Sequence, residues 1–228
     1  MITSAFQDAW VIHKSWSGDT SARVVFFTKE NGLVSCLYKG GRTPKKQALL
    51  QAFIPLWLSM DIRGDAYFVH KLEVASSSIP LVGQTLFAGL YVNELLHHAL
   101  KPHDPHATLH TVYIHALQAL MTAFSRVAIE KILRRFEWAL LTACGYSMSL
   151  THDARSTQPI LVTHFYRFIA GEGFVLADDG ISGAHIIAMS QDKLDDLTVL
   201  NVAKWIMRRA IEHALDGKVI KTRALYRS

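Results

Sequence analysis

Cysteine is scarce in this sequence. Only Cys36 and Cys144 occur among its 228 residues, and each lies inside an apolar stretch. Two such residues are typical of buried free thiols, whereas small secreted proteins carry a framework of disulfides. We therefore expect no disulfide and a protein of the reducing cytoplasm.

Long apolar runs are also missing. A transmembrane helix needs about eighteen or more apolar residues, and the segment 52–58 is already interrupted by Pro55. The first eight residues lack the charged start and the apolar centre of a secretory signal peptide. We expect no membrane partner and a cytoplasmic location, associated with the nucleoid during repair if the protein binds DNA.

No common enzyme motif is present: the sequence has no P-loop, no GxSxG elbow and no Cys/His nucleophile pair. Histidines do crowd into one region, at His97, His98, His103, His106, His110 and His115. The dipeptides His103-Asp104 and His152-Asp153 resemble the metal site of HD phosphohydrolases. Because Pro102 and Pro105 bracket the first dipeptide, it should lie in a loop and not on the helix that such a site requires. We expect no catalytic residue, no metal and no cofactor, with an HD-like metal-dependent phosphohydrolase as an alternative.

The composition favours a globular protein. Hydrophobic residues make up 50% of the chain, enough for one large domain or two small ones. The net charge of +5 is unevenly distributed. Lys and Arg exceed Asp and Glu before residue 80 and after residue 200, whereas acids predominate between them. A nucleic-acid partner should therefore meet the two basic ends of the chain.

Up to residue 80 the pattern is that of short strands. We predict strands at residues 9–13, 22–28, 33–38, 53–61 and 67–73, separated by turn residues. Asn31-Gly32 between alternating strands is a strong hairpin signal. Five short strands predict an OB-fold barrel, although an SH3-like barrel would give almost the same pattern.

After residue 80 the hydrophobic period becomes helical. We predict helices near residues 86–95, 112–124 and 127–143, the last ending at Gly145, and a β hairpin near 160–178. Ser190 is expected to cap a short helix that extends to Asp196, and a longer helix should follow from Val199 to Gly217. The predicted class is α+β: an OB-fold domain at 1–80, then a mainly helical domain at 81–228 with a small β insertion and a basic C-terminal tail.

A basic loop follows the third predicted strand, with Gly40 and Gly41 among four cations. Glycines let a backbone approach a ligand closely, and cations supply most of the sequence-independent affinity for nucleic acids. The candidate DNA-binding residues are Lys39, Arg42, Lys45 and Lys46, together with Lys14 and Arg23. Trp16 and Tyr38 could stack on bases or pack in the barrel core, and an ordinary solvated hairpin turn is the alternative for the loop.

Two ionisable residues occupy apolar positions of the predicted helices. Glu94 shares a face with Leu90 and Tyr91, and Arg134 lies among apolar neighbours. A buried charge needs a partner. We expect a structural pair between Glu94 and Arg134 or Arg135, and not a catalytic acid.

Seven segments resemble, in order and at compatible spacing, the bacterial recombination mediator family RecO. They are Ala9-Trp10-Val11-Ile12-His13, Phe27-Thr28-Lys29-Glu30-Asn31-Gly32, Tyr38-Lys39-Gly40-Gly41-Arg42, Leu50-Gln51-Ala52-Phe53, Tyr91-Val92-Asn93-Glu94-Leu95-Leu96, Leu133-Arg134-Arg135-Phe136-Glu137 and Gly217-Lys218-Val219-Ile220-Lys221-Thr222-Arg223. The resemblance implies an OB-fold followed by a helical domain. It also implies binding of single- and double-stranded DNA, annealing of complementary strands, and loading of recombinase with RecR and the single-strand-binding protein (SSB). The family is not one of enzymes.

The sequence departs from this family pattern after Gly145-Tyr146. Many RecO proteins carry a four-cysteine zinc knuckle there, whereas residues 147–158 contain His152 and no cysteine. No zinc is therefore expected.

The resemblance also implies a site for the acidic C-terminal tail of SSB, whose tip is apolar. Such a tail needs cations beside a hydrophobic groove. We expect it on the helix that carries Trp205, Ile206 and Met207, with the cations Lys204, Arg208, Arg209, Lys218, Lys221 and Arg223. An amphipathic helix with a solvated basic face is the alternative here, and a protein-interaction module without DNA affinity is the alternative for the whole chain.

Overall fold

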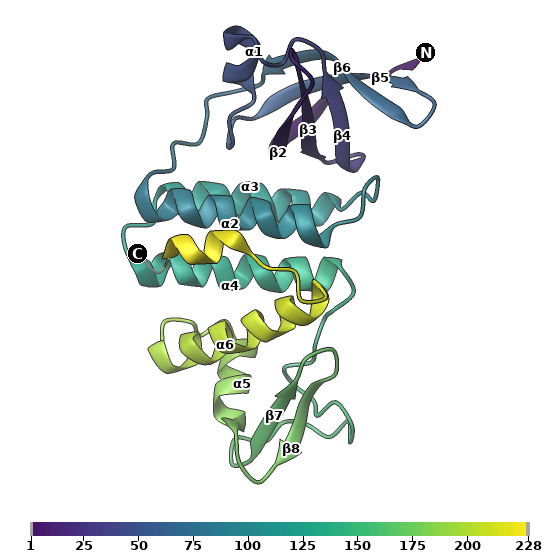
Figure 1. Cartoon of the computed structure of the whole chain (residues 1–228). Coiled ribbons are helices and arrows are strands. Elements are labelled where there is room, and N and C mark those ends of the chain that lie inside the picture. The colour runs from purple at the N-terminus through teal and green to yellow at the C-terminus, as the bar shows by residue number, and fades with distance from the viewer. Residues whose placement is uncertain (1, 227–228) are drawn as a thin grey trace. The chain divides into compact units, whose positions relative to one another are not determined.

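The N-terminal strands form a closed barrel in the computed structural model, which describes residues 2–226 (Figure 1). The strands are β1 (Ile2–Thr3), β2 (Gln7–Ser17), β3 (Ser21–Thr28), β4 (Gly32–Tyr38), β5 (Leu56–Arg63) and β6 (Ala66–Val74). Their order is β1-β5-β2-β3-β4-β6, and pairing of β5 with β6 closes the sheet. The short β1 only extends the pairing of β5. The prediction of a five-stranded barrel is thus confirmed.

Successive side chains of a strand point to opposite faces, so every second side chain of each strand points inward and fills the barrel interior. Val24, Phe26 and Val34 are completely buried there, and Tyr38 packs with them. One helix next to the barrel strands was not predicted: α1 (Pro44–Leu49) begins inside the expected basic loop. Proline suits the first helical position because its missing N–H would have no intrahelical partner there.

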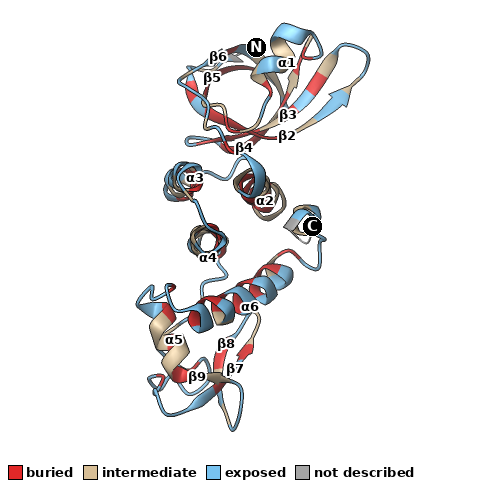
Figure 2. Cartoon of the chain, turned by 90° about the vertical axis from the view of Figure 1, so that its left-hand side faces the viewer, coloured by how far each residue is buried: buried red, intermediate tan, exposed pale blue. Residues whose placement is uncertain are grey.

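Two helices cover the outside of the barrel, α2 (Gly83–Ala99) and α3 (Ala107–Met121). Figure 2 shows them nearly end-on beside the strands. The Asn93 amide of α2 donates to the carbonyl of Val11 at 3.4 Å and accepts from the Tyr113 hydroxyl of α3 at 2.9 Å. Trp10 meets Tyr113 edge-on, with 5.6 Å between ring centroids. The barrel, both helices and the C-terminal segment from Ile220 form one compact unit.

The second compact unit is Phe124–Val219. It contains α4 (Arg126–Ala143), β7 (Phe165–Ile169), β8 (Gly173–Ala177), β9 (Ile181–Ser182), α5 (Gly183–Ser190) and α6 (Leu197–Ala214). The strands form a small sheet in the order β8-β7-β9, and α4 packs against α6. These elements confirm the α+β class with a small β insertion. The residue-80 boundary of the sequence analysis follows the last barrel strand, whereas the compact units divide after Ala123.

The predicted helix cap at Ser190 is wrong. Ser182 caps α5, which ends at Ser190. Asp192 then adopts a positive φ of 54°, a conformation that stops a helix. Asp196 begins α6, because its carboxylate accepts from the backbone N–H groups of Thr198 and Val199.

The C-terminal segment docks on α2. It forms the 3₁₀ helix η1 (Lys221–Tyr226) after the buried Ile220. The Glu94 carboxylate accepts from the backbone N–H groups of Lys221 and Thr222, each at 2.8 Å, and from the Thr222 hydroxyl. Burial alone would raise the pKa of Glu94, but these hydrogen bonds outweigh it and hold the pKa below its ordinary value.

The predicted ion pair of Glu94 with Arg134 or Arg135 is therefore wrong. Arg134 bonds to Glu137 at 2.7 Å, one turn along its own helix, and Arg135 bonds to Asp192. Glu94 instead satisfies backbone groups 127 and 128 residues away in the sequence. No helix within residues 2–226 is long and apolar enough to cross a bilayer.

Candidate nucleic-acid interface and partner pocket

The basic loop is a tight turn that leads directly into α1. Gly40 has a φ of +68°, which glycine adopts without steric cost. The Gly41 N–H donates to the Tyr38 carbonyl at 3.1 Å, and the Thr43 N–H donates to the Gly40 carbonyl at 3.0 Å. The turn therefore fixes the positions of the four cationic residues of the loop relative to the barrel.

Three of these cations lie over aromatic rings. The Lys39 ammonium is 5.7 Å from the Phe68 ring centroid, and the Lys46 ammonium is 4.7 Å from that of Tyr38. Arg42 stacks 5.1 Å above Trp16 and donates to the carbonyls of Gly18 and Asp19 at 2.9 and 3.2 Å. Such contacts orient a cation while it stays accessible to an anion. Lys45 is exposed on α1.

Sequence reasoning missed two members of this cluster, Arg63 and Phe68. The Arg63 guanidinium lies 5.2 Å from the Phe68 centroid, and parallel pairing of β4 with β6 sets Leu37 opposite Phe68. A strand pairing of that kind has no local sequence signal. We name the resulting cluster the basic aromatic surface; its members are Trp16, Lys39, Arg42, Lys45, Lys46, Arg63 and Phe68.

The remaining candidates of the barrel differ in their surroundings. Tyr38 is 7% exposed and belongs to the core, whereas Trp16 is 45% exposed, so only Trp16 of these two offers a ring to a ligand. Lys14 is half-buried, donates to the Leu50 carbonyl at 2.9 Å at the end of α1, and has a pKa lowered by burial. Arg23 points away from the barrel interior, opposite to its neighbours Ala22 and Val24.

Three of the predicted tail-binding cations lie on α6. Lys204, Arg208 and Arg209 lie on the exposed side of α6, but Ile206 and Met207 are buried. Trp205 is the one exposed residue of that apolar trio, and Arg209 stacks on it at 4.2 Å. Lys204 pairs with Glu130, and Arg208 with Glu212 at 3.1 Å.

The tail cations also divide between the compact units. Lys218 belongs with α6, whereas Lys221 and Arg223 belong to the unit of the barrel. Arg223 lies 6.0 Å from the Tyr91 ring of α2.

A pocket between α4 and α6 combines cations with apolar side chains. Its volume is about 320 Å³, and its lining includes Arg134, Arg135, Trp138, Leu150, Met189 and Met207. The Arg134 side chain is only 9% exposed, and its Nε has no hydrogen-bond partner among the described residues. Arg135, at the rim, holds Asp192 through two nitrogens. Arg134 already bonds to the Glu137 carboxylate at 2.7 Å, so a ligand carboxylate would have to meet its remaining N–H groups or those of Arg135.

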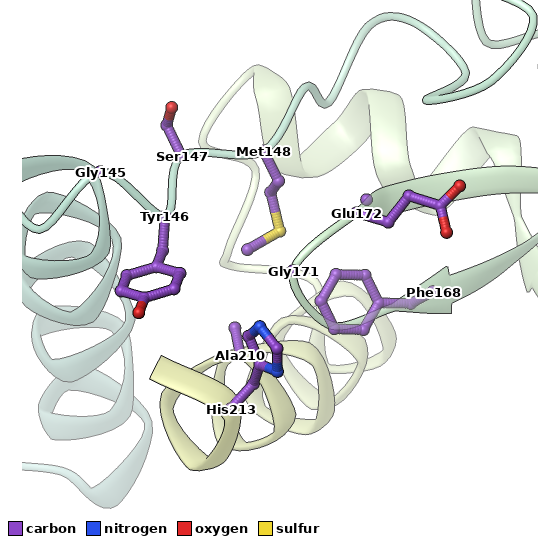
Figure 3. Close-up of a pocket in the computed structure, with 10 residues that line it drawn as sticks. Gly145, Tyr146, Ser147, Met148, Phe168, Gly171, Glu172, Ala210 and His213 are labelled. Carbon is purple, nitrogen blue, oxygen red and sulfur yellow. The ribbon is translucent and has the colours of Figure 1, made fainter. Parts of the chain in front are cut away.

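A second pocket in the same unit is much smaller, about 60 Å³ (Figure 3). Tyr146, Met148 and His213 lie around it, and the Tyr146 and His213 rings meet edge-on at 6.0 Å. Its one carboxylate, Glu172, is paired with Arg155. This pocket is too small for a large side chain. Of the two pockets described, the one lined by Arg134 and Arg135 is therefore the better candidate for a partner site.

The histidines that suggested a metal site are engaged elsewhere. His106 is the N-cap residue of α3 and lies 3.4 Å from Asp104, while His110 packs on Phe27 with 5.1 Å between ring centroids. The His152 ring contacts Thr151. Within residues 2–226, no group of three or more His, Cys, Asp or Glu side chains is placed to hold a metal ion.

Comparison with known proteins gives the same family over both units. The model described as "Recombination protein O N terminal" matches residues 1–78, and that described as "Recombination protein O C terminal" matches residues 82–217. A DNA repair protein RecO of Legionella pneumophila (strain Paris) is 53% identical over 226 residues, 99% of each chain. Those of Klebsiella pneumoniae subsp. pneumoniae and Salmonella dublin are each 36% identical over 97% of this chain and 92% and 93% of theirs. A barrel with a basic aromatic surface, a helical unit and these relatives together establish that the chain belongs to the RecO family of DNA repair proteins.

Proposed function

We propose that this protein binds single- and double-stranded DNA through the basic aromatic surface and anneals complementary strands. We further propose that, with RecR, it helps to load recombinase onto SSB-coated single strands in the cytoplasm. The observation that carries the proposal is the set of cations held over rings at one end of the barrel. Cations neutralise phosphates and release their counterions, and an exposed ring such as Trp16 can stack on a base.

The proposed mechanism uses binding energy and no bond chemistry. Two strands repel one another through their phosphates, and a surface of fixed cations lowers that repulsion. Stacking on a ring does not depend on the base, so affinity should be nearly independent of sequence. Lys14 and Arg23 would add charge at the margins of the surface.

Salt-dependent binding tests the DNA assignment. Replacing Lys39 and Arg42 by Ala should weaken binding to all oligonucleotides alike. The slope of log affinity against log salt concentration should become shallower by about 0.7 for each phosphate of a single strand that is no longer neutralised. Lys29→Ala, an exposed cation in the β3–β4 turn, is the matched control. An unchanged slope in the double variant would remove the loop from the DNA interface.

We propose that the acidic tail of SSB binds in the pocket between α4 and α6. Its apolar tip would contact Trp138 and Met207, and its carboxylates would meet Arg134 and Arg135. Lys204, which pairs with Glu130 of α4, would extend the positive charge along α6. The alternative keeps the tail on the exposed side of α6 with Arg208 and Arg209.

Charge reversal distinguishes these two places. With a fluorescent peptide that copies the acidic tail, Arg135→Glu should weaken binding by about tenfold or more, since it reverses a cation at the proposed site. Arg208→Glu is the matched reversal on the exposed side and should change the affinity far less. If Arg208→Glu has the larger effect, the tail binds the exposed side of α6.

A further inference from the structure

Trp57 is a further exposed aromatic residue of the barrel. The charged residues beside it are acidic, whereas those beside Trp16 are basic. Trp57 of β5 is 42% exposed. Its directly paired residues are Asp8 on β2 and Glu73 on β6. Directly opposed residues of antiparallel strands share one face, with Cβ atoms about 5 Å apart. An exposed indole therefore lies between two exposed carboxylates.

This row lies on the outer wall of the barrel. Leu56 and Leu58 on either side of Trp57 point inward and are buried, so Trp57 points outward. Phe6 is also exposed, at 46%, and the Lys71 ammonium lies 5.4 Å from its ring while pairing with Glu73 at 3.0 Å. Asp8, Trp57, Glu73 and Phe6 form what we name the acidic aromatic row.

The acidic aromatic row is far from the basic aromatic surface. Asp8 and Trp16 lie on the same strand, eight residues apart, which corresponds to about 25 Å in an extended chain. Asp8 and Glu73 would repel phosphates, and Lys71 offsets only part of this charge, so this end of the barrel is less suited to DNA than the basic aromatic surface. The barrel thus carries the basic aromatic surface at one end of its strands and the acidic aromatic row at the other.

We propose that the acidic aromatic row docks a protein partner that presents an arginine side chain. A guanidinium would stack on the Trp57 indole and form charge-assisted hydrogen bonds with Asp8 and Glu73. Exposed tryptophans and partner arginines are the residues that most often dominate protein interfaces. This inference rests on the proposed function, which names RecR as a protein partner, and adds the surface that such a partner uses.

Binding of purified RecR from the same bacterium tests the proposal by calorimetry with the full chain. Trp57→Ala should weaken binding by about tenfold or more, as loss of a central aromatic anchor does. Asp8→Asn combined with Glu73→Gln should weaken it too, and both effects should leave DNA affinity unchanged. Val82→Ala, another exposed apolar residue of the same unit, is the matched control, and circular dichroism verifies folding of each variant.

The outcomes separate this inference from the proposed function. If wild type binds RecR and both sets of variants bind it equally well, the row is not the docking surface, although the partnership stands. If wild type does not bind RecR, the proposed partnership fails and the row loses its occupant. If the substitutions change self-association instead, measured by sedimentation, the row is a contact between copies of this chain and the proposal is overturned.

Discussion

At the scale of single residues, the burial of His110 makes the stability of the fold depend on pH. The residue is 2% exposed, and burial lowers its pKa below the ordinary value of 6.5. Because the folded pKa is lower than the unfolded one, the unfolded state binds protons more readily as the pH falls below about 6.5. Stability should therefore be full above that pH and decline below it.

We predict that His110→Leu flattens this decline. Urea unfolding at a series of pH values from 7.5 to 5 should give a free energy of unfolding that falls less steeply for the variant than for wild type. The control is His115→Gln, at an exposed position of the same helix. Equal slopes for wild type and His110→Leu would mean that another group controls acid sensitivity.

Asp153 is a second residue whose pKa is shifted by its surroundings. Its carboxylate accepts from the backbone N–H groups of Ser156 and Leu176 at 2.6 Å and of Arg155 at 2.9 Å. The hydrogen bond from Ser156, with those from Leu176 and Arg155, lowers the pKa of Asp153 to about 2. One side chain thus ties the segment to β8.

We predict that Asp153→Ala destabilises the unit of residues 124–219 by about 1–3 kcal/mol, because it removes a charged acceptor of three backbone hydrogen bonds. The stabilisation from this carboxylate is present above its unfolded pKa of about 3.9 and is lost as the pH falls toward its folded value. Thermal unfolding of the variant at pH 7 measures the loss. Asp179→Ala, at an exposed carboxylate, should have almost no effect.

At the scale of secondary-structure elements, α2 contacts the barrel and the C-terminal segment through adjacent residues. Asn93 bonds to β2 and α3, whereas Glu94 bonds to the first turn of η1. We predict that Glu94→Gln lowers the hydrogen-exchange protection of the Lys221 and Thr222 amides by about tenfold, the equivalent of roughly 1.4 kcal/mol for a weakened charge-assisted bond. Asp216→Asn, an exposed acid just before the segment, is the control. Unchanged protection would show that other contacts, such as those of Ile220 and Arg223, hold the segment.

Strands and helices were predictable where a local pattern decides them. The alternation in residues 22–28 and 33–38 and the Asn31-Gly32 turn gave two strands almost to the residue. The six-residue α1 was missed because it is too short to show a hydrophobic period. Ser190 was predicted to begin a helix, but it is the last residue of α5, because serine also occurs at helix ends.

The site was only partly predictable, because strand pairings and distant contacts complete it. The cluster of loop cations is visible in the sequence, but the exposure of Trp16 and burial of Tyr38 depend on the closed barrel. Arg63 joins the surface through β4–β6 pairing. The partner of Glu94 lies more than 120 residues away, so no local spacing could have identified it.

At the scale of the whole molecule, the two proposed ligands belong to different compact units. The basic aromatic surface lies in the unit of the barrel, and the pocket of Arg134 and Arg135 lies in residues 124–219. Substitutions at sites without shared partners have effects that add within about 0.5 kcal/mol. The DNA and peptide affinities should therefore respond to separate sets of substitutions.

We predict that a triple variant, Lys39→Ala and Arg42→Ala with Arg135→Glu, shows the DNA affinity of the double variant and the peptide affinity of the single one, each within about twofold. Fluorescence anisotropy with a labelled oligonucleotide and, separately, a labelled tail peptide measures both at one salt concentration, because each affinity depends on salt. A triple variant that loses much more affinity for either ligand would reveal coupling between the units. The segment that returns from α6 to Glu94 would then be the first connection to test, by repeating the measurement in the Glu94→Gln background.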